Sequence, residues 1–475
     1  MSIQIDAFFN ALSRIETPVL TDISRGVHRS VRGSDLDQQL NKSAAWLKQQ
    51  GAQERSYIIA LIDNTLESAL LLLTAMRHGI AIVVQPVGTT HSALSALADR
   101  VQADAIIDGT GSAQDFGIPK YQLELFDNLV PISAPALSED TPFLVTFTSG
   151  STGQPKGIVH AARSLISCGA SFNKQTGITD KDVFLNVMPM YYMAGIFNGI
   201  IAPLERGASV VIDAGFGVPT AMSLWRSIET NSVSALWLSP TMLSLVVRLD
   251  RTAKILPPTL RHLFVGTGAM ISQDARSFLD IYGLPPQQSY GLSELLYISV
   301  DDANSPAFGS VGKPLDTVDV KFDDSGTILI ETEHSFLGYL EEGILVPANV
   351  PFRTTDIGRR SEDGTLYIEG RSDDIIVRGG LNVNPLVVES ALQKMLTGRR
   401  FCVSSRQDGT LGNSVVLVLE ATFPGDEELF QRAQREVSGR FERMNIDTMI
   451  NVETIPVGPT GKIQRSAVRS MVAQS

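Results

Sequence analysis

The first two-thirds of the chain alternate short apolar runs with helical patterns. Aliphatic and β-branched runs at residues 56–62 and 80–87 flank residues 66–79, where apolar side chains recur at helical spacing. The same alternation returns further along, at residues 208–213, 221–229 and 233–239. Apolar strands separated by helices are typical of buried, largely parallel sheets. The pattern therefore predicts an α/β architecture for this part of the chain.

Near Val318 the sequence pattern changes to alternating strands separated by polar turns. Residues 318–331 and 357–370 each place a D-S-G or D-G turn between two alternating strands. Such turns supply the positive φ that tight hairpins need. Both segments are therefore predicted to be β-hairpins.

A compact tail follows residues 370–374. It predicts a strand at 375–379, a helix at 385–396, strands near 400–405 and 414–421, and a further helix. In that last helix the residues at helical spacing are Leu429, Phe430, Ala433, Val437 and Phe441. The expected fold class is α/β. It has a large N-terminal domain of stacked α/β subdomains with a β-hairpin-rich subdomain, residues 1–370, and a small α+β C-terminal domain, residues 371–475.

Composition and charge narrow the function classes. The 475 residues are 43% hydrophobic and 19% charged, as in an ordinary globular protein. The net charge of −12 and the lack of basic runs disfavour nucleic acid as a partner. Cys168 and Cys402 form no C-x-x-C pair, and the six histidines are scattered, which argues against a disulfide scaffold or a zinc cluster.

The N-terminus has no basic segment followed by an apolar core, so no secretory signal is expected. The most apolar stretch, residues 57–84, is interrupted by Asp63, Glu67 and Arg77, which disfavours an integral membrane segment. A cytoplasmic location is the expectation.

Candidate chemistry begins with "TFTSGSTGQPKG", residues 146–157. Pro155 and Gly157 flank Lys156, and strand-like residues follow, so this is not a Walker loop. Glycines let backbone N–H groups approach a ligand, and clustered hydroxyls with one ammonium can coordinate phosphoryl oxygens. Taken alone, the segment supports a flexible turn and a phosphate site equally.

Four further segments follow this loop in a recognisable order: "QSYGLSE" (288–294), "RTTDIG" (353–358), "GRSDDIIVRGGLNVNP" (370–385) and "PTGKIQR" (459–465). With the loop, they resemble the adenylate-forming superfamily of acyl- and aryl-CoA synthetases, peptide-synthetase adenylation domains and beetle luciferases. The resemblance covers residues 142–465, and the first 140 residues match only in general texture. It implies a mobile C-terminal domain.

The resemblance also implies roles for nucleotide-binding residues. Those taken to wrap the β- and γ-phosphates of ATP are Thr148, Ser149, Gly150, Ser151, Thr152, Gly153 and Lys156. Tyr290 is similar to the residue that stacks on adenine, Ser293 to a catalytic hydroxyl at the α-phosphate, and Glu294 to a catalytic carboxylate that binds Mg²⁺. The further cofactor-binding residues implied are Gly268, Ala269, Ser289 and Gly291.

In the C-terminal third, Asp356 resembles the carboxylate that accepts both ribose hydroxyls, and Arg371 a residue near the ribose and phosphates. Lys462 resembles the catalytic lysine that bridges the substrate carboxylate and the α-phosphate. Asp373 falls at the hinge position. Gly379 and Gly380 fall beside the channel for a pantetheine thiol, although two adjacent glycines equally fit a tight turn.

The pocket for the acid is implied at residues 188–199, 237–242 and 266–272. The pocket residues expected are Tyr191, Tyr192, Met193, Gly195, Asn198 and Trp237. Such side chains suit an apolar or aromatic tail, although they are as often core residues. No aspartate follows that would meet an α-ammonium group, so an amino acid substrate is disfavoured.

Three positions depart from the family pattern. Tyr192 stands where a histidine usually closes the acyl pocket, Thr355 replaces a common glycine before Asp356, and Val387 replaces a frequent glutamate. The first puts the usual gating role in doubt. The other two could tune domain rotation.

The reaction implied uses ATP, Mg²⁺ and a small carboxylic acid to form acyl-AMP, and then transfers the acyl group to CoA. An alternative acceptor is the phosphopantetheine of a carrier protein acting in trans, because only 13 residues follow Lys462. A non-catalytic sensor of ATP or acyl-AMP is a third alternative. The identity of the acid and the oligomeric state, a homodimer included, stay open.

Overall fold

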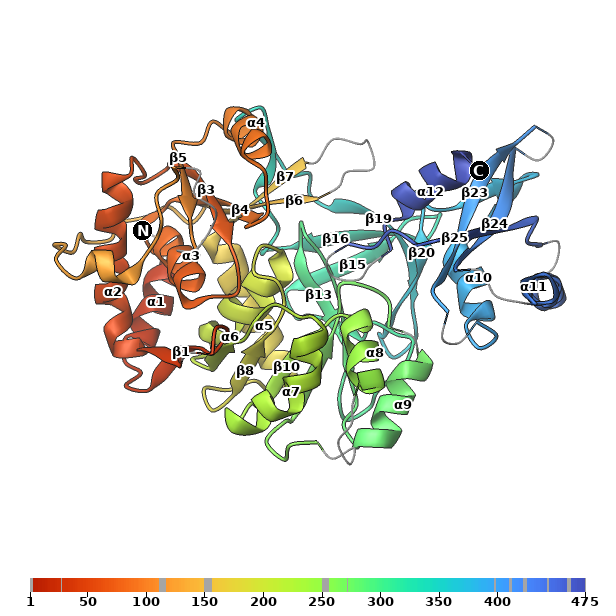
Figure 1. The fold of residues 1–475 in the computed structure, drawn as a ribbon, viewed down its shortest axis with the longest axis horizontal. Coiled ribbons are helices and arrows are strands. Elements are labelled where there is room, and N and C mark those ends of the chain that lie inside the picture. The colour runs from red at the N-terminus through yellow and green to blue at the C-terminus, as the bar shows by residue number, and fades with distance from the viewer. Residues whose placement is uncertain are drawn as a thin grey trace. The chain divides into compact units, whose positions relative to one another are not determined.

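The computed structural model describes residues 3–26, 28–110, 117–148, 156–249, 256–270, 272–396, 399–409, 412–421, 425–441, 444–458 and 463–474. The chain forms two compact units (Figure 1). The first comprises Met1–Asp319 and Glu331–Phe352. The second comprises Val320–Ile330 and Arg353–Ser475.

The first unit contains a nine-stranded sheet. Its order is β14 (Lys313–Pro314), β13 (Leu296–Val300), β12 (Gln287–Leu292), β11 (His262–Val265), β10 (Ala235–Leu238), β8 (Val183–Asn186), β9 (Ser209–Ile212), β1 (Pro18–Asp22), β2 (Arg29–Arg32). The interior pairs from β12 to β1 are parallel, and β13, β14 and β2 join antiparallel at the edges. The predicted buried, parallel strands are thus confirmed, and all four residues of β10 are buried.

A second, seven-stranded sheet carries the first candidate motif. Its order is β18 (Ile344–Pro347), β17 (Gly338–Glu341), β7 (Lys156–Ala161), β6 (Pro142–Thr148), β4 (Ala81–Pro86), β3 (Tyr57–Ile62), β5 (Ala105–Asp108). Strands β5, β3, β4 and β6 are parallel, whereas β7, β17 and β18 continue the sheet antiparallel. The strands on either side of residues 149–155, β6 and β7, are therefore antiparallel neighbours, as the predicted strand-to-strand connection requires.

Helices cover these sheets. They are α1 (Ile3–Leu12), α2 (Gly33–Gln49), α3 (Leu66–His78), α4 (His91–Val101), a 3₁₀ turn (Leu123–Phe126), α5 (Ala162–Thr176), a π-helix (Ala194–Ile201), α6 (Ala202–Glu205), α7 (Val218–Thr230), α8 (Pro240–Leu249), α9 (Ser272–Tyr282). The N-cap of α3 is Thr65, whose hydroxyl accepts from the Ser68 N–H, and its C-cap is Gly79 with φ +67°. Helix α5 contacts strands of both sheets, and its Phe172 stacks on Tyr297 of β13 with centroids 4.0 Å apart.

The second unit holds a four-stranded sheet, a hairpin and a three-stranded sheet. The strands are β15 (Val318–Phe322), β16 (Thr327–Thr332), β19 (Phe352–Arg360), β20 (Leu366–Arg371); β21 (Ile376–Arg378), β22 (Leu381–Val383); β23 (Phe401–Asp408), β24 (Gly412–Glu420), β25 (Thr448–Val452). The helices are α10 (Pro385–Leu392), α11 (Asp426–Arg440) and α12 (Arg465–Gln474). Both hairpins predicted from their turns are confirmed, as β15–β16 and β19–β20.

Alternate side chains of β24 face two different hydrophobic clusters of the second unit. Val415 and Leu417 face α10 and α11, whereas Val416 and Val418 face Val468 of α12. By compactness, both hairpins belong largely to this unit. The domain boundary predicted near Arg371 marks the start of the C-terminal domain that is expected to rotate during the reaction. This boundary stays a prediction. Every described helix is too short or too polar to cross a bilayer.

Candidate active site

Four parallel strands of the nine-stranded sheet, β8, β10, β11 and β12, end at one edge. Trp237 of β10 is in register with Phe264 of β11, and Val265 of β11 with Gln288 of β12. The carboxyl edge of such a sheet is where ligands bind in open α/β folds. The segments predicted to line the site are the ones that follow these strands.

The loop after β8 is held by two buried asparagines. The Asn64 side chain donates to the Met188 carbonyl (3.1 Å) and accepts from the Met190 N–H (3.0 Å). The Asn186 side chain donates to the Gly195 carbonyl (3.0 Å). Neither asparagine was predicted as part of the site. The loop is therefore fixed by the body of the first unit.

The predicted pocket residues lie on this loop and on the π-helix that follows it. Tyr191 and Tyr192 are half-buried with ring centroids 4.8 Å apart, and burial raises the pKa of both phenols. Met193 precedes the helix and Asn198 is buried within it. A Cβ at Gly195 would lie 2.1 Å from the Pro189 carbonyl oxygen, so only glycine fits there.

Trp237 and the loop after β11 form a second predicted wall. The indole of Trp237 is buried, and a Cβ at Gly266 would lie 2.4 Å from it. The Gln288 side chain donates to the Gly268 carbonyl and accepts from the Met270 N–H, each at 3.3 Å. Gln288 thus ties the loop with Gly268 and Ala269 to β12.

The "SYGLSE" segment is a strand end and a tight turn between β12 and β13. Ser289, Tyr290 and Gly291 belong to β12, and Tyr290 is largely buried. A Cβ at Gly291 would lie 2.2 Å from the Leu296 carbonyl oxygen, so the hairpin requires glycine. Ser293 and Glu294 occupy the turn.

Three hydrogen bonds from the seven-stranded sheet side hold this turn. His160 Nε2 lies 2.7 Å from the Ser293 carbonyl, the Phe336 N–H donates to the Glu294 carbonyl (2.9 Å), and the Tyr339 hydroxyl donates to Glu294 Oε1 (3.1 Å). Burial lowers the pKa of His160 to about 4, so the ring is neutral and donates from Nε2. His160 and Tyr339 were not predicted as site residues.

Lys156 lies near Tyr339, which also contacts this turn. Its ammonium lies 5.1 Å from the centroid of the Tyr339 ring and 3.9 Å from Glu341 Oε1. Thr148 is paired with Lys156 in the β6–β7 register. The other loop residues predicted to bind phosphate, Ser149, Gly150, Ser151, Thr152 and Gly153, lie outside the described residues.

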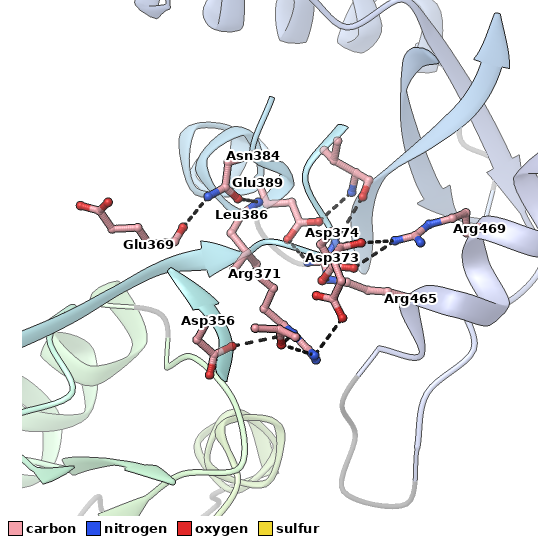
Figure 2. Close-up of polar contacts among 12 residues, drawn as sticks. Asp356, Glu369, Arg371, Asp373, Asp374, Asn384, Leu386, Glu389, Arg465 and Arg469 are labelled. Atoms are coloured by element: carbon pink, nitrogen blue, oxygen red, sulfur yellow. Dashed lines mark hydrogen bonds and ion pairs between the residues drawn. The ribbon is translucent and has the colours of Figure 1, made fainter. Parts of the chain in front are cut away.

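In the second unit, Asp356 of β19 is paired with Arg371 of β20 (Figure 2). Asp356 is buried, and its Oδ1 lies 3.8 Å from Arg371 Nε. The guanidinium donates to the Thr355 hydroxyl from Nη2 (2.7 Å) and from Nε (3.2 Å), and to Asp373 Oδ2 (3.0 Å). The two residues predicted to bind the ribose and phosphates therefore lie side by side.

Asp373 and Asp374 contact different elements. The Asp373 carboxylate accepts from Arg371 of β20, whereas its carbonyl lies 3.4 Å from Arg469 Nη2 of α12. The Asp374 carboxylate accepts from Arg469 (3.0 Å) and lies 3.6 Å from Arg465 Nε. At the predicted hinge, the Asp373 carboxylate therefore contacts the four-stranded sheet, and the Asp374 carboxylate contacts α12.

Gly379 and Gly380, with φ of +55° and +79°, form the two-residue turn between β21 and β22. Both are exposed, and positive φ at two successive residues favours glycine. Their role beside a thiol channel stays a prediction. Lys462 lies outside the described residues.

Three residues after Lys462, Arg465 opens α12 in a largely enclosed ion pair. Its Nη2 donates to Glu389 Oε2 of α10 (2.7 Å), and its Nη1 to the Val403 carbonyl (3.3 Å). Glu389 Oε1 accepts from the Val403 N–H (2.7 Å). The pair therefore satisfies both backbone groups of Val403 on the open edge of β23.

Comparison with known proteins identifies similar chains. Fatty acid–acyl-carrier-protein ligase MmaC of Mycobacterium marinum is 25% identical over 93% of this chain and 92% of its own. Indoleacetate–CoA ligase of Aromatoleum aromaticum is 26% identical over 92% of each chain. Among solved structures, ATP-bound MatB from Rhodopseudomonas palustris matches 98% of each chain with a TM-score of 0.82 at 19% identity, which shows the shared fold.

A family model described as AMP-binding enzyme matches residues 10–340, more than half of the chain. This range contains the loop before Lys156, the pocket segments and the turn of Ser293 and Glu294. The chain belongs to the AMP-binding enzyme family.

Proposed function

We propose that this enzyme activates a carboxylic acid with ATP to give acyl-AMP and pyrophosphate, and then transfers the acyl group to a thiol. The observation that carries the proposal is the meeting of Lys156 and Glu294, from segments far apart in the chain, at Tyr339. A cation and a carboxylate at one place suit a triphosphate and its metal ion. The names of the relatives, acid–CoA and acid–carrier-protein ligases, agree with this chemistry.

The proposed reaction requires side chains that neutralise negative charge. The acid carboxylate must approach the α-phosphate, and both are anions. Lys156 would contact the departing pyrophosphate, Asp356 would accept the ribose hydroxyls, and Lys462 would stand between the two reacting anions. Fixed donors aimed at developing charge lower a barrier without reorganisation.

Magnesium would be held by Glu294 together with phosphate oxygens. Within the described ranges, no group of three or more His, Cys, Asp or Glu side chains gathers in a metal-binding cluster. Magnesium is commonly bound by one or two carboxylates plus substrate phosphates, so a single protein carboxylate fits it. The ion would neutralise charge on the phosphates, while Glu294 keeps its orientation through Tyr339.

The acid is proposed to carry an apolar or aromatic tail. Tyr191, Tyr192 and Trp237 are at least half-buried near the carboxyl edge of the parallel strands. Neutral aromatic walls favour such a tail, with Tyr192 in place of the usual histidine.

The experiment is acid-dependent ATP–pyrophosphate exchange over a panel of aryl and aliphatic acids. Exchange with at least one acid is expected, and it removes the sensor alternative. No exchange with any acid, despite ATP binding, would favour the sensor.

The acceptor is tested separately, by thioester formation with CoA and with a carrier protein. CoA is the acceptor proposed. The carrier-protein alternative is supported by the name of the Mycobacterium marinum relative. Transfer to a carrier protein with none to CoA would select it.

Thr355 offers a graded test of Arg371. Removing the hydroxyl in Thr355→Val removes the acceptor that Nε and Nη2 share and leaves Nη2 bonded to Asp373 alone, so the KM for ATP in exchange should rise about fivefold. Thr355→Ser keeps the hydroxyl and should stay within about twofold of the parent. Equal KM values in the two variants would refute a role for the hydroxyl.

A further inference from the structure

Tyr339 of β17 lies between two opposite charges in the first unit. Its ring faces the Lys156 ammonium at 5.1 Å, and its hydroxyl donates to Glu294 Oε1 at 3.1 Å. One neutral side chain therefore contacts both a cation and a carboxylate. No sequence motif singled out this residue.

The position of Tyr339 is fixed by its neighbours. Tyr339 is in register with Ile158 of β7, the strand that begins with Lys156. Its ring packs edge-on against Phe336 with centroids 4.9 Å apart, and Phe336 packs against Phe352 at 5.7 Å. The phenol thus has little freedom to move away from either charge.

The same short segment also holds Glu294 by its backbone. The Phe336 N–H donates to the Glu294 carbonyl at 2.9 Å. With the Tyr339 hydroxyl on the carboxylate, two residues three positions apart set both the main chain and the side chain of Glu294. This arrangement goes beyond a chance surface contact, because both bonds come from one segment to one residue.

A lysine and a glutamate that contact the same side chain could instead form a direct ion pair with one another. A direct pair would turn the ammonium away from phosphate and would occupy the carboxylate. An aromatic face attracts a cation without carrying a charge of its own, and a phenol hydroxyl orients a carboxylate through a single donated hydrogen bond. Tyr339 can therefore contact both groups without adding a charge of its own.

We propose that Tyr339 is a positioning residue that keeps Lys156 and Glu294 apart and orients them for the triphosphate and its magnesium ion. This inference rests on the proposed function. It assigns to Tyr339 two separable actions: the hydroxyl orients the carboxylate, and the ring holds the ammonium. Each action can be removed by its own substitution.

The test measures binding of ATP by the full-length protein with no acid present, by titration calorimetry in Mg²⁺ and again with Mg²⁺ chelated. Tyr339→Phe keeps the ring and loses the hydroxyl, so affinity in Mg²⁺ should fall about fivefold with little change for metal-free ATP. Tyr339→Leu loses both contacts and should weaken binding under both conditions. In exchange assays both variants should raise the KM for MgATP more than they lower kcat.

Two controls separate this role from general damage. Tyr367→Phe removes a hydroxyl from a strand of the second unit, where the ring lies against Arg359. Glu341→Gln removes a carboxylate 3.9 Å from Lys156 and leaves Tyr339 in place. Neither should change the ratio of the two ATP affinities.

The outcomes are distinguishable. A parent protein that binds no ATP overturns the proposed function. A parent that binds ATP more tightly with Mg²⁺, with the same ratio of affinities in Tyr339→Phe, overturns the inference alone. Should Tyr339→Leu fail to fold, Tyr339→Phe still decides the matter.

Discussion

Lys462→Ala is expected to lower acid-dependent ATP–pyrophosphate exchange by about a hundredfold to a thousandfold. The lysine is the cation proposed to stand between the acid carboxylate and the α-phosphate. Without it, the repulsion of two anions enters the barrier directly. The effect should fall on kcat, because the charge acts as the two anions approach and the rest of the nucleotide site is untouched.

The second half-reaction provides the internal control. Thioester formation from supplied acyl-AMP should proceed in Lys462→Ala at close to the parent rate, because the α-phosphate no longer has to be attacked. Lys394→Ala removes an exposed ammonium from the same unit and should leave both steps intact. Equal loss of both half-reactions in Lys462→Ala would contradict the assigned role.

Strands and hairpins were the part of the fold most readily predicted, for a local reason. The runs at 57–62 and 81–86 became β3 and β4 because they are apolar on both faces. The D-S-G and D-G turns determined the two hairpins of the second unit. Each of these signals is contained within a few residues.

Sheet order could not be predicted in the same way. β17 pairs with β7, and Tyr339 faces Ile158, although a long stretch of chain separates them. That pairing depends on tertiary packing. The joining of hairpin β19–β20 to the second compact unit also depends on contacts that no local pattern encodes.

The residues of the candidate site also differ in whether a local sequence signal or tertiary packing places them. Residues in motifs, such as Glu294 and Asp356, were named from the sequence because their types and order are characteristic. Residues that hold the motif and pocket segments, such as Tyr339, His160 and Asn64, lie on other strands and loops and act through side-chain hydrogen bonds. A local signal for His160 was its place in "GIVH", shortly after the loop predicted to bind phosphate.

Arg465→Met is expected to destabilise the second unit by about 3 kcal/mol at about pH 7, because it strands the Glu389 carboxylate in a largely enclosed site. Burial already raises the pKa of Glu389 while Arg465 is present. Removing the guanidinium removes a charge that lowers this pKa, so the pKa of the carboxyl rises further. The substitution also removes the Arg465 contact of Asp374, but Asp374 keeps its ion pair with Arg469.

The sign of the pH dependence follows from this shift. A carboxyl with a folded-state pKa above its unfolded value binds its proton more tightly when folded, so stability falls as the pH rises through the folded pKa. The difference from the parent should therefore be largest near neutral pH. It should shrink as the pH falls through the raised pKa and Glu389 becomes protonated.

A matched variant isolates the charge. In Arg465→Met with Glu389→Gln, the amide oxygen can still accept from the Val403 N–H, but nothing titrates at that position. This double variant should be more stable than Arg465→Met near neutral pH, and residue 389 should contribute nothing to the pH dependence of its stability. Trp46, Trp225 and Trp237, the three tryptophans of the chain, all lie in the first unit, so their fluorescence would miss the event. Pulse proteolysis in urea, monitored by the disappearance of the C-terminal fragment, measures the stability of the second unit directly. A loss of stability in Arg465→Met that does not change with pH would refute the buried-charge explanation.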